Sequence, residues 1–265
     1  MKQYVVDAFT EKVFKGNPAA VCVMDHWIPD ELMQNIAKEN RFSETAFTVK
    51  EGDVYHLRWF TLAGEIDFCG HATMATTYVL FNFYEKKSTK LEYNTKVGKM
   101  IVTKKDDTYV MNFPAYKCNS IPVTKAMKEA VGSEVLEAYL DRDLLLVLPD
   151  EDTVRNLKPN QKKVKELDGL LLAVTAKGKN YDCVSRVFAP KTNVNEDPVT
   201  GSAHCMITPY WCEKLGKNKL NCYQASERGG QLYTSLEGDR VNVAGKAALY
   251  SIGEILPDKL NKESC

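Results

Sequence analysis

Most apolar positions of this chain fall in short runs, and Gly or Asp residues separate the runs. Segments such as 144–148 and 170–174 have the length of a buried strand, and the separators are typical of turns. Two longer apolar stretches, at about 72–84 and 203–215, each follow a glycine, and we predict a helix for each. Shorter helices are predicted at about 29–40, at about 123–131 and, in pieces, over 150–166.

The first and second parts of the chain resemble each other. Arg58 and Arg186 lie in similar strand patterns 128 positions apart, and Gly70 and Gly201 before the long helices are 131 apart. Three later matches keep offsets of 129, 132 and 132; they are 90–93 with 219–222, Gly98 with Gly230, and Asp107 with Asp239. Any one match can arise by chance, but five in the same order favour an internal duplication.

Each part reads as strands, a central helix and a meander of strands, which predicts an α+β fold with two pseudo-symmetric halves. Pro114 and Pro122 interrupt the strand pattern between the parts. We therefore expect a first half at 1–115, with its central helix at about 72–84. The second half is expected at 116–265, with its central helix at about 203–215.

The charge balance narrows the range of partners. The chain has 35 Lys+Arg and 35 Asp+Glu, so it lacks the basic excess typical of nucleic-acid or membrane-surface proteins. No apolar run is long enough to cross a bilayer. The first residues include Asp7 within an apolar stretch and do not resemble a signal peptide, so we expect a cytoplasmic protein.

Eight cysteines are present, without a C-x-x-C pair. In a cytosolic chain of this length we expect reduced thiols that serve mainly as small buried side chains. An H-x-x-x-H spacing is also missing, which argues against metal-dependent hydrolysis. We therefore predict neither a metal site nor a cofactor.

The starts of the two long helices are candidate substrate-binding sites. Their free backbone N–H groups and the helix dipole attract anions, and two facing copies would suit a small acidic metabolite. Taken singly, either segment reads equally well as an ordinary helix start capped by Thr200 or Ser202. The candidate substrate-binding residues are Gly70, Ala72, Gly201, Ser202 and Ala203.

Three titratable residues are candidates for catalysis. Glu44 lies between a predicted helix and an apolar strand, and a desolvated carboxylate there would suit general acid/base work. The position of Glu44 between these two elements, taken alone, slightly favours a solvated glutamate in a turn over a catalytic carboxylate. His71 stands at a helix start beside glycine, and Asp197 precedes the second long helix, where it could orient His71 or favour the dipole.

Two further motifs have no assigned function. Asn17-Pro18 marks a turn before a strand, and a plain turn is at least as good a reading as a binding role. The segment 228–230, Arg-Gly-Gly, reads as a tight turn between strands. A single copy is not an RNA-binding segment.

Taken together, these motifs resemble the phenazine-biosynthesis-like (PhzF) family, which shares the fold of diaminopimelate epimerase. The matching segments span most of the chain in order, whereas about 115–180 matches only loosely. They are 7–10, 16–21, 43–47, 57–61, 69–73, 186–190, 196–204 and 228–230.

The resemblance implies two halves, each a barrel-like, mostly antiparallel sheet around a central helix, with the active site in the cleft between them. It implies that Glu44 moves the proton and that His71 and Asp197, with Gly70, Gly201 and Ser202, hold the substrate. The best-understood member isomerises a dihydro-hydroxyanthranilate in a biosynthetic pathway without cofactor or metal, and members often form homodimers.

The related epimerases use two thiols, one on each face of the substrate carbon. Here Cys69 has Thr200 as its counterpart in the second half, and Cys205 lies inside the helix, so a two-thiol mechanism is not expected. We expect a cofactor-independent isomerase that moves a proton and a double bond in a small carboxylate-bearing substrate, with Glu44 as general acid/base. The alternatives are a non-catalytic binding or scaffold protein of the same fold, or an epimerase or racemase.

Overall fold

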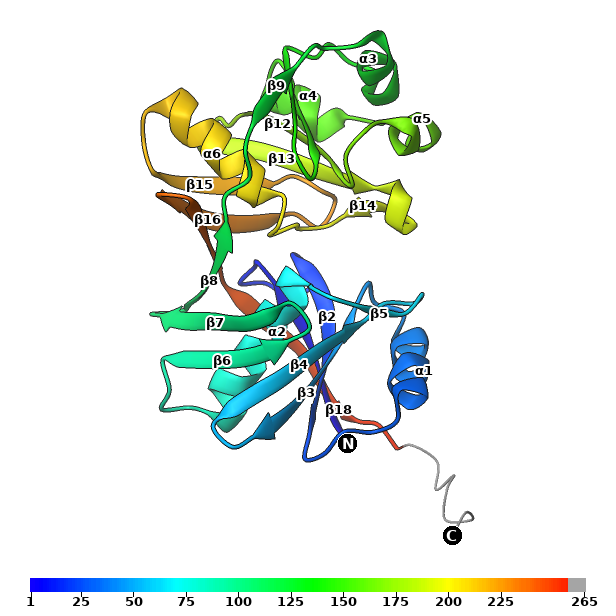
Figure 1. The fold of residues 1–265 in the computed structure, drawn as a ribbon, viewed down its shortest axis with the longest axis vertical. Coiled ribbons are helices and arrows are strands. Elements are labelled where there is room, and N and C mark those ends of the chain that lie inside the picture. Colours follow the sequence, from blue (N-terminus) through cyan, green and yellow to red (C-terminus); the bar gives the residue numbers. More distant parts are fainter. Residues whose placement is uncertain (257–265) are drawn as a thin grey trace.

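The computed structural model describes residues 1–256, in which 18 strands form one hydrogen-bonded network. The first part of the chain builds one curved sheet around a central helix, and the second part builds another (Figure 1). Pairings are mostly antiparallel, with four parallel exceptions. The fold is therefore the expected α+β arrangement of two pseudo-symmetric halves.

The elements follow the chain in the same order in each half. Those of the first half are β1 (Lys2–Ala8), β2 (Asn17–Met24), α1 (Asp30–Asn40), β3 (Thr45–Glu51), β4 (Val54–Phe60), β5 (Glu65–Ile66), α2 (Gly70–Val79), the π-helix η1 (Leu80–Tyr84), β6 (Lys90–Thr95), β7 (Gly98–Lys105) and β8 (Thr108–Pro114).

The second half adds short helices between strands that otherwise correspond to those of the first. Its elements are β9 (Asn119–Ile121), α3 (Lys125–Val131), β10 (Glu137–Leu140), β11 (Leu144–Val147), α4 (Glu151–Asn156), α5 (Gln161–Glu166), β12 (Leu172–Lys177), β13 (Cys183–Ala189), the 3-10 helix η2 (Pro190–Thr192), β14 (Val194–Asp197), α6 (His204–Leu215), β15 (Lys219–Gln224), β16 (Gly230–Glu237), β17 (Arg240–Gly245) and β18 (Ala247–Glu254).

The strand pairings repeat from one half to the other. The parallel pairs β2–β3 and β4–β6 correspond to β11–β12 and β13–β15. The antiparallel pairs β3–β4, β6–β7 and β7–β8 correspond to β12–β13, β15–β16 and β16–β17. The weak repeat in the sequence thus reflects a repeated topology.

The two halves meet where β8 pairs antiparallel with β17. Met111 lies opposite Val243, and these positions differ by 132, which is the offset of the sequence repeat in this region. Each of the two residues therefore faces its own counterpart, so a pseudo-two-fold axis passes between them. Beside this axis, Asn112 Nδ2 donates to Asn242 Oδ1 at 2.7 Å and adds a side-chain contact between the halves.

The strand that ends each repeat pairs with the other repeat. β9 follows β8 as β18 follows β17, so by the repeat β9 belongs with the first half although it lies beyond residue 115. β9 pairs with β10, and β18 pairs with β1. The last strand of the described chain thus completes the first sheet. The division between residues 115 and 116 stays a prediction.

The duplication extends to side-chain contacts. Arg58 binds both carboxylate oxygens of Glu65 at 2.7 and 2.8 Å, and its guanidinium lies 5.2 Å from the ring centre of Phe60. Arg186 binds Glu196 at 2.7 and 2.8 Å and lies 5.1 Å from the ring of Phe188. The bidentate geometry holds β5 and β14 in equivalent places, just before the two central helices.

The central helices lie close to the predicted positions. Helix α2 begins at Gly70, two residues earlier than predicted, and continues as a π-helix to Tyr84. Helix α6 begins at His204 and contains Pro209, which has no N–H to offer the carbonyl of Cys205. That carbonyl accepts instead from the backbone N–H of Tyr116 at 2.8 Å. The missing helical bond is thereby replaced by a tie to the segment that joins the halves.

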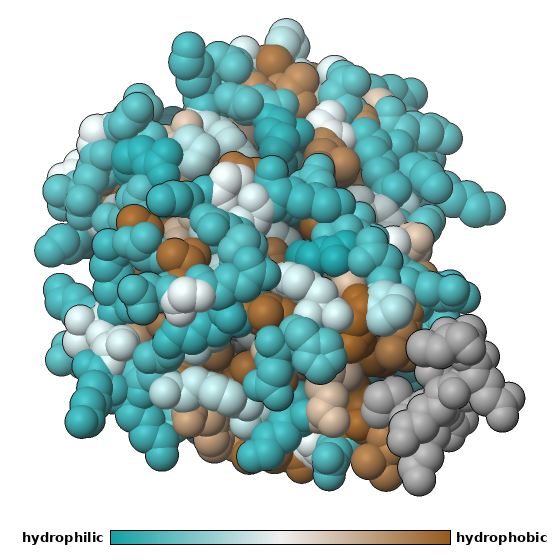
Figure 2. All heavy atoms as spheres, turned by 60° about the horizontal axis from the view of Figure 1, so that its bottom comes forward, coloured by the Kyte–Doolittle hydropathy of each residue, from teal (hydrophilic) through white to brown (hydrophobic). Residues whose placement is uncertain are grey.

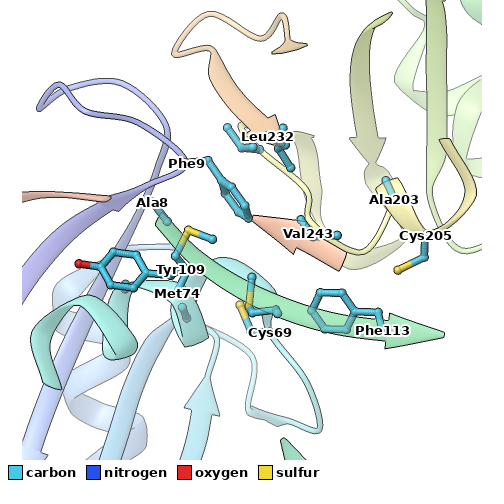
Figure 3. Packing of buried hydrophobic residues seen from close by; sticks show 14 of the residues in the cluster. Ala8, Phe9, Cys69, Met74, Tyr109, Phe113, Ala203, Cys205, Leu232 and Val243 are labelled. Atoms are coloured by element: carbon cyan, nitrogen blue, oxygen red, sulfur yellow. The ribbon is translucent and has the colours of Figure 1, made fainter. Parts of the chain in front are cut away.

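One apolar core runs through both halves. Figure 3 shows Phe9 and Met74 from the first half beside Leu232 and Val243 from the second. The packing leaves no room at Gly245, because a Cβ there would lie 2.5 Å from the Phe9 ring. The halves therefore pack as parts of a single core.

Hydrophilic residues cover most of the face in Figure 2, with smaller hydrophobic areas between them. In residues 1–256 no helix is both long and apolar enough to cross a membrane. Seven cysteines are free thiols, and all but Cys118 are buried, which confirms their expected packing role in this part of the chain. Cys265 lies outside the described residues.

The two equivalent arginines should differ in their contribution to stability. Arg186 also donates to the carbonyls of Val154, Arg155 and Leu157, the last at 2.7 Å, whereas Arg58 adds only the exposed Asp30. We expect Arg186→Met to lower the free energy of unfolding by about 3 kcal/mol. Arg58→Met should cost about 1 kcal/mol less, because fewer acceptors lose their donor. Urea unfolding measures both, and equal losses would contradict the comparison.

Candidate active site

Glu44 occupies the position immediately before β3. Helix α1 ends with Arg41 in a left-handed conformation (φ 57°), which turns the chain toward that strand. The Glu44 carbonyl accepts from Ala20 N–H of β2 at 3.4 Å. Its side chain is only 15% exposed, so the structure excludes the solvated turn glutamate that spacing alone slightly favoured.

His71 lies in the first turn of α2 and faces Glu44. Its Nε2 lies 3.0 Å from Glu44 Oε2, and the imidazole is 7% exposed. Neither atom has another polar partner among the described residues. Among the described residues, these two buried atoms are therefore each other's only polar partner, while Nδ1 of the same ring has further neighbours.

Asn17, the first residue of β2, connects His71 to the second half. Its Nδ2 lies 3.1 Å from His71 Nδ1, 2.7 Å from Asp197 Oδ1 and 3.0 Å from the Val199 carbonyl. The amide thus offers two hydrogens to three acceptors from α2 and from the segment before α6. Asp197 therefore reaches His71 through Asn17 rather than by direct contact.

The segment before α6 is fixed by a second amide. Gln224 at the end of β15 donates from Nε2 to the Asp197 carbonyl at 2.7 Å and accepts from Thr200 N–H at 2.8 Å. Thr200 Oγ1 in turn donates to Asp197 Oδ2 at 2.5 Å. These bonds hold the Asp197 carboxylate toward Asn17.

Burial and neighbouring charges shift the titration of this cluster. Burial acts to lower the pKa of His71, but the Cys69 sulfur and the Glu44 carboxylate raise it, and the net pKa lies well above 6.5. Burial raises the pKa of the Asp197 carboxyl above its usual 3.8, against the opposing effect of His71. The neighbouring Glu44 carboxylate and Cys69 sulfur therefore favour the protonated imidazole, against the cost of burial.

Cys69 contacts the imidazole of His71, whereas the sequence had suggested only a packing role. Its Sγ lies 3.5 Å from His71 Nδ1, and burial raises the pKa of the thiol, which stays protonated near neutral pH. The expectation that Cys69 serves only for packing is therefore incomplete. Across the pseudo-axis stands Thr200, which bonds to Asp197, so a pair of facing thiols is not formed.

Glu44, Cys69 and His71 are all metal-ligand types, and their donor atoms lie within 4.8 Å of one another. Glu44 approaches Nε2 of the imidazole, however, whereas Cys69 approaches Nδ1. An ion on one ring nitrogen would be turned away from one of the other two groups. The arrangement suits proton exchange through the imidazole better than a three-ligand metal centre.

Helix α2 and the turn that leads into α6 both begin at this cluster, through His71 and Thr200. The N–H groups of the first turn of α6 already donate to the carbonyls of residues 201–203, so the candidate anion-binding N–H groups on this side are those of 201–203 themselves. Arg142 lies beside this turn: its Nη2 donates to Ser202 Oγ at 3.3 Å and its Nη1 to Tyr116 Oη at 3.1 Å, while its Nε pairs with Asp143 at 3.2 Å. These groups together would attract a carboxylate.

The structure therefore brings together Glu44, His71 and Asp197, with the candidate substrate-binding residues at the adjacent helix starts. The sequence patterns indicated no role for Arg142 or Gln224, and for Asn17 they left a binding role open beside a plain turn. The Asn17-Pro18 motif was a usable signal for one of them. For Gln224 and Arg142 no local signal exists, since their partners are distant in sequence.

Two equivalent half-sheets, each around a central helix, with a carboxylate and an imidazole paired at the start of α2, define the epimerase-like fold class. The family model described as phenazine biosynthesis-like protein matches residues 6–253. The chain belongs to this family.

Individual relatives agree with this assignment. An uncharacterized isomerase of Pseudomonas aeruginosa is 44% identical over 251 residues, covering 94% of this chain and 96% of that protein. A PhzF-family crystal structure from Enterococcus faecalis has a TM-score of 0.95 and 49% identity, covering 97% and 99% of the two chains. A probable proline racemase from Agrobacterium radiobacter, at 10% identity and TM-score 0.63 over 98% and 94% of the chains, shares the fold. The protein is an isomerase of this family.

The raised His71 pKa predicts a pH dependence of stability. The folded state binds this proton more tightly than the unfolded chain, so its contribution is complete below about pH 6.5 and is lost as the pH rises through the folded pKa. The stability difference between wild type and His71→Asn should therefore shrink between about pH 6 and pH 9. Urea unfolding across this range measures it, and a difference that grows with pH would show that the imidazole is buried neutral.

Proposed function

We propose that this isomerase moves a proton and a double bond within a small carboxylate-bearing substrate, without a cofactor, and that Glu44 is the general acid/base. The observation that carries the proposal is the buried Oε2 of Glu44, which lies 3.0 Å from His71 Nε2 and has no other polar partner among residues 1–256. A carboxylate with so few partners is costly unless it serves the chemistry.

The reaction begins when Glu44 takes a proton from a carbon next to an unsaturated system. The C–H bond breaks, an O–H bond forms on Glu44, and the electron pair delocalises over the substrate. The proton then returns to a different carbon, which regenerates the carboxylate and leaves the double bond shifted. Atoms and electrons balance within the substrate, so no further reactant is needed.

His71 and the two helix starts would stabilise the substrate and the charge that develops during this reaction. His71 Nε2 lies 3.0 Å from the carboxylate, and a proton on that nitrogen would offset the negative charge that develops in the transition state. The helix starts at Gly70–Ala72 and Gly201–Ala203 would hold the substrate carboxylate, with Arg142 adding positive charge at the second. A small acidic metabolite is thus the substrate class that the site favours.

An epimerase or racemase is the second candidate, because distant relatives of the same fold carry such names. That chemistry needs an acid/base group on each face of one carbon. Opposite the Cys69 side of the site stands Thr200, a weak base whose hydroxyl is engaged by Asp197. A shift between two carbons with one base fits the described residues better.

Glu44→Gln tests the base directly. The amide keeps the shape but cannot accept a proton, so turnover should fall by roughly two to four orders of magnitude. Because the substrate is unidentified, a mixture of small carboxylic acids from a cell extract is incubated with wild type in ²H₂O. Mass spectrometry should then find a compound that gains deuterium with wild type and not with the variant.

Two controls make this result specific. Glu65→Gln removes a carboxylate that pairs with Arg58 and Lys96 away from His71, and it should label the same compound as wild type. Thermal unfolding should show that Glu44→Gln remains folded. Labelling by Glu44→Gln at the wild-type rate would show that another group is the base.

A further inference from the structure

The loop between β1 and β2 is held in an unusual backbone conformation. Phe9, Phe14 and Gly16 all have positive φ angles, of 64°, 69° and 65°. Gly16 has no space for a side chain, because a Cβ there would lie 2.1 Å from the carbonyl oxygen of Ala8. Left-handed residues cost free energy outside glycine, so other contacts must stabilise this loop.

Arg228, in the turn between β15 and β16, supplies those contacts from the second half. Its Nη2 donates to Asp7 Oδ1 at 2.7 Å and to the Lys15 carbonyl at 3.0 Å, and its Nε donates to the Gly16 carbonyl at 2.8 Å. The adjacent Gly229 adds a backbone contact, because its carbonyl accepts from Gly16 N–H at 2.7 Å. We call these contacts of Arg228 and Gly229 with Asp7, Lys15 and Gly16 the clamp.

Asp7 makes this clamp stronger than a surface ion pair. Its side chain is 4% exposed, and its second oxygen accepts from Phe14 N–H at 2.8 Å. One guanidinium thus joins a buried carboxylate and two loop carbonyls, which requires the planar fork of arginine. A lysine could keep the charge opposite Asp7 but could not reach all three acceptors.

The clamp ends one peptide bond from the active site. Gly16 is followed by Asn17, which is fully buried and whose amide reaches His71, Asp197 and Val199. An N–H that points at Nδ1 of an imidazole favours the form in which that nitrogen carries no proton. The position of Asn17 therefore affects where His71 carries its proton and how tightly it binds it.

We propose that Arg228 is a positioning residue for the active site: from the second half it fixes Gly16, and through it the amide of Asn17 on His71 Nδ1. The other charged or titratable groups near His71 are Glu44, Cys69 and Asp197, and Arg228 contacts none of them. The hydrogen bonds of the Arg228 side chain itself lead to His71 through Gly16 and Asn17. The catalytic part of this inference rests on the proposed function, whereas the effect on the imidazole does not.

The titration of His71 tests the proposal without any substrate. Imidazole nitrogen and carbon NMR signals are followed against pH, and His71→Asn identifies the signal among four histidines. In Arg228→Met the amide of Asn17 shifts, and His71 should bind its proton roughly two- to tenfold more tightly, the range of one net hydrogen bond. The share of Nδ1-protonated imidazole should rise with it. Arg228→Lys should give a smaller change in the same direction.

Asn17→Ser shows whether the effect passes through Asn17. It should shift His71 in the same direction as Arg228→Met, and the double variant should show no more than the Asn17→Ser shift. Lys246→Met is the matched control, because Lys246 pairs with Glu11 in the same loop and with Asp107 but makes no contact with Gly16. It should leave the titration of His71 at the wild-type position.

Three results would overturn the proposal. They are a wild-type His71 titration in Arg228→Met, an equal shift in Lys246→Met, and shifts that add in the double variant. If Arg228→Met does not fold because Asp7 is left unpaired, a wild-type titration in Arg228→Lys overturns it. Retained activity of Glu44→Gln would refute the proposed base and leave these titrations unaffected, so the two failures are distinguishable.

Discussion

The pairing of β8 with β17 is the constraint on which the rest of this structure depends. Because Met111 and Val243 face each other across the pseudo-axis, the two sheets have one possible mutual orientation. That orientation brings the starts of α2 and α6 to a common cluster, in which Asn17 bonds to His71 and to Asp197. Reciprocal exchange of β9 and β18 then makes each sheet incomplete without the other.

The strands and helices repeat from one half to the other, whereas the residues of the candidate active site do not. The strand registers place Leu171 at the position equivalent to Glu44, since Thr45 faces Phe60 just as Leu172 faces Phe188. By the repeat offset, Ser202 stands where the first half has His71. One half thus supplies the base and the imidazole, and the other supplies Asp197 and the amide of Gln224 that holds it.

Local patterns predicted much of the fold. The helices at 72–84 and 203–215 and the turns between strands follow from residues close together in sequence, and the repeat offsets indicated the symmetry. The exchange of β18 left no such signal, because β1 and β18 are about as far apart in sequence as the chain allows. Within the site, Glu44, His71 and Asp197 stood out by residue type. Gln224 and Arg142 did not, because only tertiary contacts distinguish them from ordinary polar residues.

The return of the last strand bears on how this chain folds. β1 has β2 as an early neighbour, but its other edge pairs with residues 247–254, which are synthesised after all the other described strands. During synthesis the first sheet therefore keeps an open edge until β18 has been made. Pairings between such distant segments close slowly, because the entropy of a long loop is lost before the contact forms. The late step of folding is thus expected to be the docking of β18, and with it the closing of the first half.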